Sequence, residues 1–244
     1  MPPLKSKDVC IVTGGSGGNG LGIVKAFLSA GYRVITVDVS RFSESLDVFH
    51  YIGDVSDQLL MNEIFDKALS LNPSKLCLVN NAGISIGSDK DPVERWQKTI
   101  EINLTAPFNW CQQYAELVRK KSFPRGAIIN IGSLATIMGF PDNPSYQAAK
   151  SGVMGLTRAF AYDLGEYGIT VNCISPGYIP TNMTKNSFDD PVKNKQRAMH
   201  TLLGRWGSAD DIGNAAVFLC SNEAAYITGI NLPVDGGWSV KGLI

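Results

Sequence analysis

Short apolar segments alternate with longer amphipathic segments along the whole chain. Seven segments rich in valine and isoleucine, each bounded by turn residues, are predicted strands: 8–13, 32–38, 48–53, 76–81, 126–132, 169–175 and 230–235. Helices are predicted between them, near 18–30, 57–71, 92–120, 144–166 and 208–221. Strands this apolar alternating with helices favour a parallel sheet covered on both faces and joined by right-handed crossovers. We therefore expect a single α/β domain over residues 1–244, doubly wound, with a seven-stranded and mostly parallel sheet.

Two segments depart from this alternation. Only 15 residues separate Asp38 from Asp54, so this crossover has room for at most a turn or two of helix. Residues 178–205 form a long, polar segment, predicted to be irregular, after the strand that ends near Ser175. A long insertion at the carboxyl end of a strand is typical of a substrate lid.

Charge and hydropathy exclude several functional classes. The 22 basic residues balance the 22 acidic residues, so no strong field would attract nucleic acid or an anionic membrane. No apolar run reaches the 18 residues of a membrane span, and residues 1–10 lack the apolar core of a signal peptide. We expect a soluble, cytoplasmic protein that has neither nucleic acid nor a membrane as a partner.

The cysteines and histidines give little support for metal or triad chemistry. Cys10, Cys77 and Cys173 lie in predicted strands, so the five cysteines are expected to be buried and reduced, without a metal site. His50 and His200 are not next to a serine or cysteine motif. A hydrolase triad is therefore poorly supported.

A glycine-rich turn joins the first predicted strand to the first predicted helix. Residues 13–22 read Thr-Gly-Gly-Ser-Gly-Gly-Asn-Gly-Leu-Gly and fit both GxGxxG and GxxxGxG. Such a turn lets backbone N–H groups approach a pyrophosphate, which the helix N-terminus stabilises through its partial positive charge. A flexible connection remains the alternative for the turn alone, but its position predicts a Rossmann-type dinucleotide site.

Asp38 lies 20 positions after Gly18, at the end of the second predicted strand. Its carboxylate could accept hydrogen bonds from both hydroxyls of an adenosine ribose and would repel a 2′-phosphate. NAD is therefore favoured over NADP, although Arg41 could soften the repulsion and Asp38 could instead cap a loop.

Tyr146 and Lys150 lie one helical turn apart on the helix that Asn143 and Pro144 are predicted to begin. An ammonium beside a phenol favours the phenolate, which would bring the Tyr146 pKa toward working pH. This spacing is also ordinary on an amphipathic helix, so the pair needs support from elsewhere in the chain.

That support comes from the combination of motifs, which resembles the classical short-chain dehydrogenase/reductase family over essentially the whole chain. The matching residues, in order, are Thr13-Gly14-x-x-x-Gly18-x-Gly20, Asn80-Asn81-Ala82-Gly83, Asn103, Ser133, Tyr146-x-x-x-Lys150, Pro176-Gly177-x-Ile179-x-Thr181 and Asp235-Gly236-Gly237. The resemblance implies an oxidoreductase that interconverts a secondary alcohol and a ketone with a nicotinamide cofactor. The short crossover between Asp38 and Asp54 departs from the family pattern and leaves open how the adenine pocket is walled.

The resemblance also implies roles for individual residues. Tyr146 would be the general acid/base, Ser133 would polarise the substrate oxygen, and Lys150 would lower the Tyr146 pKa and bind the nicotinamide ribose. Asn103 would complete the catalytic set as a proton-relay residue. The implied cofactor-binding residues are Gly14, Ser16, Gly18, Asn19, Gly20, Leu21, Asp38, Asp54, Val55, Asn81, Ala82, Gly83, Tyr146, Lys150, Pro176, Gly177, Ile179 and Thr181.

The substrate is less well defined than the chemistry. The residues expected around it are mostly apolar and could equally be core residues: Ser133, Leu134, Phe140, Tyr146, Tyr178 and Met183, with Ile84 and Trp206. Lid residues Lys185, Lys193, Lys195 and Arg197 could attract an acidic substrate, although a solvated charged face is the simpler interpretation. A small polyol, sugar or hydroxy acid fits best. The alternative is a carrier-bound 3-oxoacyl substrate, for which the family usually prefers NADP.

Other hypotheses concern assembly and class. Family members are commonly homotetramers, and the small residues Ala148, Ala149, Gly152 and Gly155 could let two helices pair. A nucleotide-binding sensor or scaffold is the non-enzyme alternative, which the complete catalytic set disfavours. An extended epimerase or dehydratase is disfavoured because only 68 residues follow Pro176.

Overall fold

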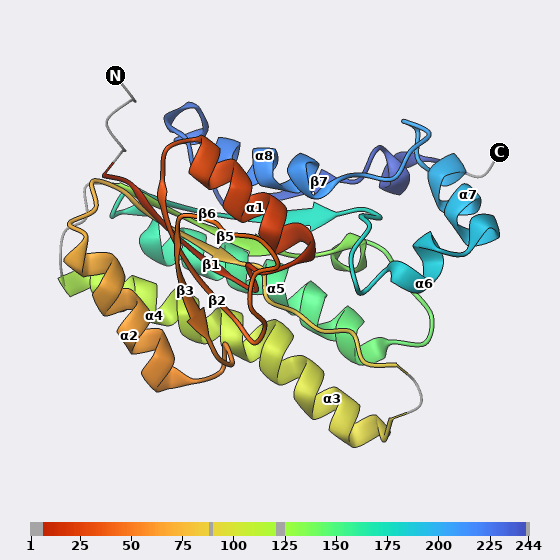
Figure 1. Cartoon of the computed structure of the whole chain (residues 1–244), viewed down its shortest axis with the longest axis horizontal. Coiled ribbons are helices and arrows are strands. Elements are labelled where there is room, and N and C mark those ends of the chain that lie inside the picture. Colours follow the sequence, from red (N-terminus) through yellow and green to blue (C-terminus); the bar gives the residue numbers. More distant parts are fainter. Residues whose placement is uncertain (1–6, 88–89, 121–124, 243–244) are drawn as a thin grey trace.

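Seven parallel strands form one twisted sheet in the order β3-β2-β1-β4-β5-β6-β7 (Figure 1). The computed structural model describes residues 7–87, 90–120 and 125–242. The strands are β1 Val9–Thr13, β2 Arg33–Asp38, β3 Val48–Ile52, β4 Leu76–Asn80, β5 Gly126–Ile131, β6 Ile169–Pro176 and β7 Asn231–Val234. The α-helices are α1 Gly18–Ser29, α2 Gln58–Ser70, α3 Pro92–Ile100, α4 Ala106–Lys120, α5 Pro144–Gly165, α6 Lys185–Phe188, α7 Pro191–His200 and α8 Ala209–Leu219. The expected α/β fold and strand positions are confirmed, and the sheet is wholly parallel.

The sheet separates two apolar cores because successive side chains of a strand point to opposite faces. Ile11 packs with α2, α4 and α5 on one face, whereas Cys10 and Val12 pack with α1 and α8 on the other. Figure 1 shows α1 and α8 on one side of the sheet and α2, α4 and α5 on the opposite side. All four residues from Val9 to Val12 are fully buried, which explains why the strands read as continuous apolar runs.

The strand order reverses between β1 and β4. The chain moves outward from β1 to β2 and β3, and then returns to place β4 on the other side of β1. In doubly wound sheets, a crevice opens at the carboxyl ends of the strands where the order reverses. The loops after Thr13, Asn80 and Ile131 therefore meet at one edge of the sheet.

Two local features, the helix predicted over 92–120 and the segment 178–205, differ from the sequence-based expectation, whereas the short crossover between β2 and β3 agrees with it. The helix predicted over 92–120 contains a π-helical turn, Glu101–Thr105, between α3 and α4. Between β2 and β3, the described chain has no helix, and Phe42 and Leu46 of this loop pack onto the core beside α1. The segment 178–205, expected to be irregular, contains α6 and α7. Asp190 caps α7 and Pro191 begins it. This pair is a helix-start signal, but it lies inside a segment dominated by polar residues.

The predicted burial of the cysteines is confirmed, since all five thiols are buried and unbridged. In the described part of the chain, none of the helices has the length and apolar character needed to cross a bilayer.

Helices α1 and α8 pack so closely that neither tolerates a side chain at the contact. A Cβ on Gly22 would collide with the Ala209 carbonyl, and a Cβ on Gly213 would lie 2.5 Å from the Gly22 carbonyl oxygen. Gly165, at the end of α5, has open space around the position of its Cβ.

We predict that Gly22→Ala lowers the free energy of unfolding by about 1–3 kcal/mol, because α8 must move away. Gly165→Ala is the control and should be neutral or slightly stabilising, since alanine is the better helix former. Urea unfolding followed by circular dichroism measures both variants. Equal stability of the two would contradict the close packing of α1 on α8.

Candidate active site

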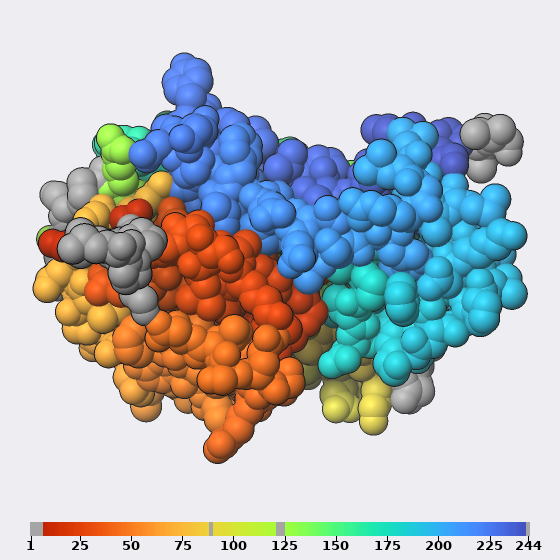
Figure 2. Space-filling view, turned by 45° about the horizontal axis from the view of Figure 1, so that its top comes forward, coloured from red at the N-terminus to blue at the C-terminus, as the bar shows by residue number. Residues whose placement is uncertain are grey.

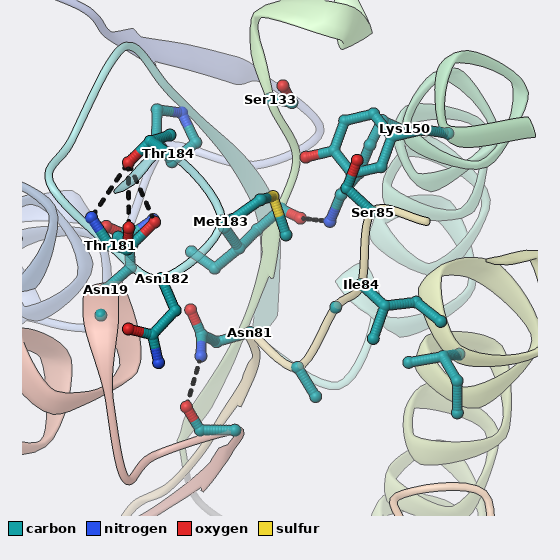
Figure 3. A pocket seen from close by; sticks show the side chains of 18 of the residues that line it. Asn19, Asn81, Ile84, Ser85, Ser133, Lys150, Thr181, Asn182, Met183 and Thr184 are labelled. Carbon is teal, nitrogen blue, oxygen red and sulfur yellow. Dashed lines mark hydrogen bonds between the residues drawn. The ribbon is translucent and has the colours of Figure 1, made fainter. Parts of the chain in front are cut away.

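A crevice of about 710 Å³ opens along the carboxyl edge of the sheet. Its walls come from the glycine-rich turn, the loops after β4 and β5, the start of α5 and the segment after β6. Figure 3 shows side chains from these elements converging, with Asn81 and Asn182 near one another and Ser133 and Lys150 farther along. In Figure 2, the segment 178–205 (cyan to light blue) lies against the N-terminal part of the chain (red).

The glycine-rich turn gives this crevice an anion-binding end. Gly17 precedes α1 without any side-chain cap, so the first N–H groups of the helix are open to a ligand. Gly14 and Gly18 have φ values of +67° and +51°, which glycine adopts without strain. The Asn19 Oδ1 is buried without a hydrogen-bond partner, and Asn19 lines the crevice.

A hydrogen-bonded clasp joins the ends of β1 and β4 at the floor of the crevice. The Asn81 side-chain amide donates to the carbonyl oxygens of Thr13 (3.0 Å) and Gly14 (2.8 Å). The Thr13 hydroxyl accepts from the backbone N–H groups of Asn81 (3.0 Å) and Ala82 (3.1 Å). A Cβ on Gly14 would lie 2.8 Å from the Ala82 Cα, so only glycine permits this approach.

Asp38 lies at the rim beside the glycine-rich turn. Its carboxylate accepts from the backbone N–H groups of Ser16 and Ser40, each at 3.0 Å. Val39 and Ser40 line the crevice with it, whereas Arg41 is exposed and is not among the lining residues. The carboxylate is thus oriented at the place where the second strand ends.

Asp54 and Lys98 form a charged pair farther along the same end. The Asp54 carboxylate accepts from the Ser56 N–H (2.9 Å) and hydroxyl (2.8 Å), and the Lys98 ammonium lies 3.9 Å away. The backbone N–H of Ser56 is the main cause of the lowered pKa of Asp54, with Lys98 a smaller one. Lys98 was not predicted, because a lysine on an exposed helix has no sequence signature.

Ser133, Tyr146 and Lys150 meet at the other end. The Lys150 Nζ donates to the Ile131 carbonyl (2.8 Å) and lies 5.8 Å from the centre of the Tyr146 ring. Burial lowers the pKa of the Lys150 ammonium to about 8, a shift that Cys173 slightly opposes. Burial raises the pKa of Tyr146, and a hydrogen bond with Ser133 opposes that rise. The pKa of Tyr146 is therefore raised, whereas a lowering by Lys150 was expected, and the opposing effect comes from Ser133.

Asn103 lies in the π-helical turn and is fully buried. Its side-chain amide donates to the Ile84 carbonyl (2.7 Å) and accepts from the Ile84 N–H (2.8 Å). A Cβ on Gly83 would lie 3.3 Å from the Asn103 Oδ1 and 3.5 Å from the Lys150 Nζ. Asn103 therefore holds the loop after β4 close to Lys150, without lining the crevice itself.

Most residues selected from the sequence line this one crevice. They are Gly14, Ser16, Gly18, Asn19, Asp38, Asp54, Val55, Asn81, Ala82, Gly83, Ile84, Ser133, Leu134, Phe140, Tyr146, Lys150, Pro176, Gly177, Tyr178, Ile179, Thr181 and Met183.

Four residues of the catalytic, cofactor and apolar substrate sets lie elsewhere, as do the lid residues Lys185, Lys193, Lys195 and Arg197. Gly20 packs so tightly against the Gly14 carbonyl that a Cβ would collide with it, and Leu21 follows it within α1. Trp206 packs behind the wall, with its ring centre 5.5 Å from that of Tyr178. Asn103 holds the loop after β4 through its hydrogen bonds with Ile84, as described above. Sequence reasoning missed Ser85, Lys98, Asn143, Gln147 and Asn182 as lining residues.

Comparison with known proteins places the chain in a family. A family model described as enoyl-(acyl carrier protein) reductase matches residues 15–239. The 2-dehydro-3-deoxy-D-gluconate 5-dehydrogenase of Bacillus subtilis is 38% identical over 245 residues, covering 96% of this chain and 95% of the relative. A 3-oxoacyl-[acyl-carrier-protein] reductase of Chlamydia muridarum is 36% identical over 252 residues, covering 97% and 99%. The chain belongs to the short-chain dehydrogenase/reductase family, and it is an NAD(P)-dependent oxidoreductase that acts on CH–OH groups.

Solved structures agree on the fold and differ in cofactor. A proposed 2-deoxy-D-gluconate 3-dehydrogenase of Agrobacterium tumefaciens, with bound NADP, superposes with a TM-score of 0.86 at 35% identity, covering 97% of this chain and 98% of that chain. A 4-hydroxyisoleucine dehydrogenase complexed with NADH gives 0.86 at 28% identity, covering 96% and 100%. The cofactor class is therefore NAD(P).

The buried Lys150 ammonium predicts a pH-dependent stability. The Lys150 pKa is about 8 in the folded protein, against an ordinary 10.5. Between these values the unfolded chain binds more protons, so stability rises with pH across this window, by an amount on the order of 3 kcal/mol. We predict that the free energy of unfolding of the wild type, relative to Lys150→Met, increases from pH 8 to pH 10.5. Denaturant titrations at several pH values measure this difference, and a constant difference would contradict the buried ammonium.

Proposed function

We propose that this protein is an NAD(H)-dependent oxidoreductase that interconverts a secondary alcohol and a ketone, with Tyr146 as the general acid/base. The observation that carries the proposal is the convergence of Ser133, Tyr146 and Lys150 at one end of a crevice whose other end has Asp38 and the open N-terminus of α1.

The residues of the crevice fit a dinucleotide. The uncapped N-terminus of α1 suits a pyrophosphate. The unpartnered Asn19 Oδ1 is an acceptor, so it suits a hydroxyl or N–H group of the same ligand. Asp38 would hold the adenosine ribose, Asp54 and Val55 would meet the adenine, and Ile179 with Thr181 would hold the carboxamide. Asn81, Ala82 and Gly83 would pass the ribose, and Lys150 would bind the nicotinamide ribose. When bound, the nicotinamide ring supplies an acceptor or donor of hydride.

The chain's own residues would move the proton. As an alcohol is oxidised, its hydroxyl proton passes to the Tyr146 oxygen, and the Ser133 hydroxyl stabilises the oxygen that gains negative charge. In the reverse direction, Tyr146 protonates the ketone oxygen. The hydrogen bond with Ser133 lowers the pKa of Tyr146 against the larger raising effect of burial. The Lys150 ammonium, 5.8 Å from the centre of the Tyr146 ring, would favour the phenolate further by its positive charge. Asn103 would support a proton relay by holding the loop beside Lys150.

The preference for NAD follows from Asp38. Its carboxylate is fixed by two backbone N–H groups at the rim, where a ribose hydroxyl of NAD would donate a hydrogen bond to it. A 2′-phosphate at the same place would meet a negative charge, and the exposed Arg41 is not among the residues that line the crevice.

The proposed substrate is a small polyol, sugar or hydroxy acid, since the B. subtilis relative is named for a sugar acid. Leu134, Phe140, Tyr178 and Met183 supply an apolar wall beside Ser133 and Tyr146. The second candidate is a carrier-bound 3-oxoacyl substrate, after which the C. muridarum relative is named, with NADP as the cofactor. Asp38 argues against that cofactor, and the complete catalytic set argues against a non-catalytic sensor or scaffold.

A homotetramer remains a proposal that α5 supports only in part. Ala149 is buried within the chain, and Gly152 packs against Leu104. Gly155 is exposed with open space around it, so it is the residue of this group that is free for close approach by a partner helix.

We predict that Tyr146→Phe lowers turnover by roughly 10² or more, because the general acid/base is lost, while NADH still binds. Tyr162→Phe is the matched control, since Tyr162 lies on the same helix and is 89% exposed. NADH absorbance measures turnover and NADH fluorescence measures binding. Full activity of Tyr146→Phe would remove Tyr146 from the mechanism.

We predict that Asp38→Asn weakens NADH binding by about tenfold and weakens NADPH binding less, because the charge that holds the ribose hydroxyls and repels the 2′-phosphate is removed. Asp66→Asn, on the exposed surface of α2, is the control. Fluorescence titration with both cofactors gives the ratio of dissociation constants. An equal change for NADH and NADPH would refute the assignment of Asp38.

A further inference from the structure

Gln147 lines the crevice immediately after Tyr146 and uses both ends of its side-chain amide to hold one loop. Its Nε2 donates to the carbonyl oxygens of Ala135 and Met138, the latter at 2.8 Å. Its Oε1 accepts from the Phe140 N–H at 3.3 Å. All three partners belong to the stretch between Ser133 and α5, which has only one short 3₁₀ turn, Leu134–Thr136, of its own.

The hydrogen bonds of Gln147 are linked to Ser133 through Ala135. The Ala135 N–H donates to the Ser133 Oγ at 3.2 Å, while the Ala135 carbonyl accepts from Gln147 and, at 3.4 Å, from the Ser151 hydroxyl. The peptide groups on both sides of Ala135 are thus restrained, one by Ser133 and the other by α5. Because Gln147 adjoins Tyr146 in the helix, it connects the element that bears Tyr146 to the loop that bears Ser133.

The loop also supplies part of the wall next to the catalytic residues. Leu134 and Phe140, at its two ends, both line the crevice. An irregular loop keeps a single conformation only where its backbone N–H and C=O groups form hydrogen bonds. The Gln147 side-chain amide suits this task, because it uses two donor hydrogens and one acceptor oxygen toward the loop. Any change in the loop would therefore move the Ser133 hydroxyl and the Phe140 wall together.

We propose that Gln147 is a positioning residue that fixes the loop from Ser133 to Phe140 against α5 and thereby determines which alcohols and ketones the site accepts. The substrate part of this inference rests on the proposed function. Without the Gln147 amide, the loop samples several conformations, the wall at Phe140 becomes loose, and discrimination between small and branched substrates decreases.

Two variants and a control test the positioning role. Gln147→Met keeps the length of the side chain and removes all three hydrogen bonds. Gln147→Glu keeps the acceptor for the Phe140 N–H but places a carboxylate against two carbonyl oxygens, and on protonation it regains one donor. Gln97→Met, on the exposed surface of α3, makes the same chemical change away from the loop.

Hydrogen exchange of the free protein is the first readout and needs no substrate. We expect backbone amides of residues 134–140 to exchange about tenfold faster in Gln147→Met than in wild type, since the bonds lost are worth roughly that factor. Gln97→Met should match the wild type. In Gln147→Glu, exchange should be faster than in wild type at neutral pH. As the pH is lowered, the exchange rate should decrease toward that of the wild type. Unchanged exchange at 134–140 in both Gln147 variants would overturn the proposal.

Steady-state kinetics with a small and a branched ketone is the second readout. We expect Gln147→Met to raise KM several-fold for the preferred ketone and to bring the kcat/KM values of the two ketones closer together. The dissociation constant for NADH should be unchanged. An unchanged ratio, or a fall in melting temperature that accounts for the whole loss, would overturn the selectivity role. If the wild type reduces neither ketone with NADH or NADPH, the proposed function fails, and the exchange measurement still decides the positioning role.

Discussion

The clasp between the ends of β1 and β4 is the interaction on which the site depends. The connections that follow these two paired strands diverge, because the chain leads from β1 to β2 on one side and from β4 to β5 on the other. The Asn81 amide and the Thr13 hydroxyl satisfy backbone groups that the end of the sheet would otherwise leave unpaired. Gly14 lets the two backbones meet without a clash, so the floor of the crevice lies between the residues proposed to bind the cofactor and those proposed to be catalytic.

Helix α5 brings the catalytic end together at a cost to stability. Asn143 caps the helix by accepting from the Tyr146 N–H (3.3 Å) and also donates to Ser85 (3.0 Å), so the cap itself is tied to the loop after β4. One turn later, Lys150 places an ammonium in a buried site, where it donates to the Ile131 carbonyl. A buried charge of this kind is unfavourable for folding and is typical of functional sites. The same helix restrains the Ser133 loop through Gln147 and Ser151.

The fold and the two ends of the site were predictable because each has a local signature. Apolar strands alternating with helices implied the parallel sheet, and glycines next to a strand implied the anion-binding turn. Asp38, Ser133, Tyr146 and Lys150 lie at positions that local patterns mark, either a strand end or one helix face. The π-helical turn at Asn103 and the helices α6 and α7 were not predicted. A π-helical turn adds one residue to a helix, and no sequence pattern distinguishes that residue from its neighbours. Helix α7 has no buried residue and therefore no apolar stripe.

By itself, the sequence determined the order of strands and helices, the family, the nucleotide turn and the residues available for proton transfer, since these depend on spacing along the chain. Only the tertiary structure decided which side chains share a cavity and which hydrogen bonds hold them there. Gln147 and Lys98 line the crevice, and Trp206 and Gly20 serve packing instead. The Tyr146–Lys150 pair illustrates the difference. Their spacing predicts that they share a helix face, but the depth of burial, which sets both pKa values, arises from segments far away in the sequence.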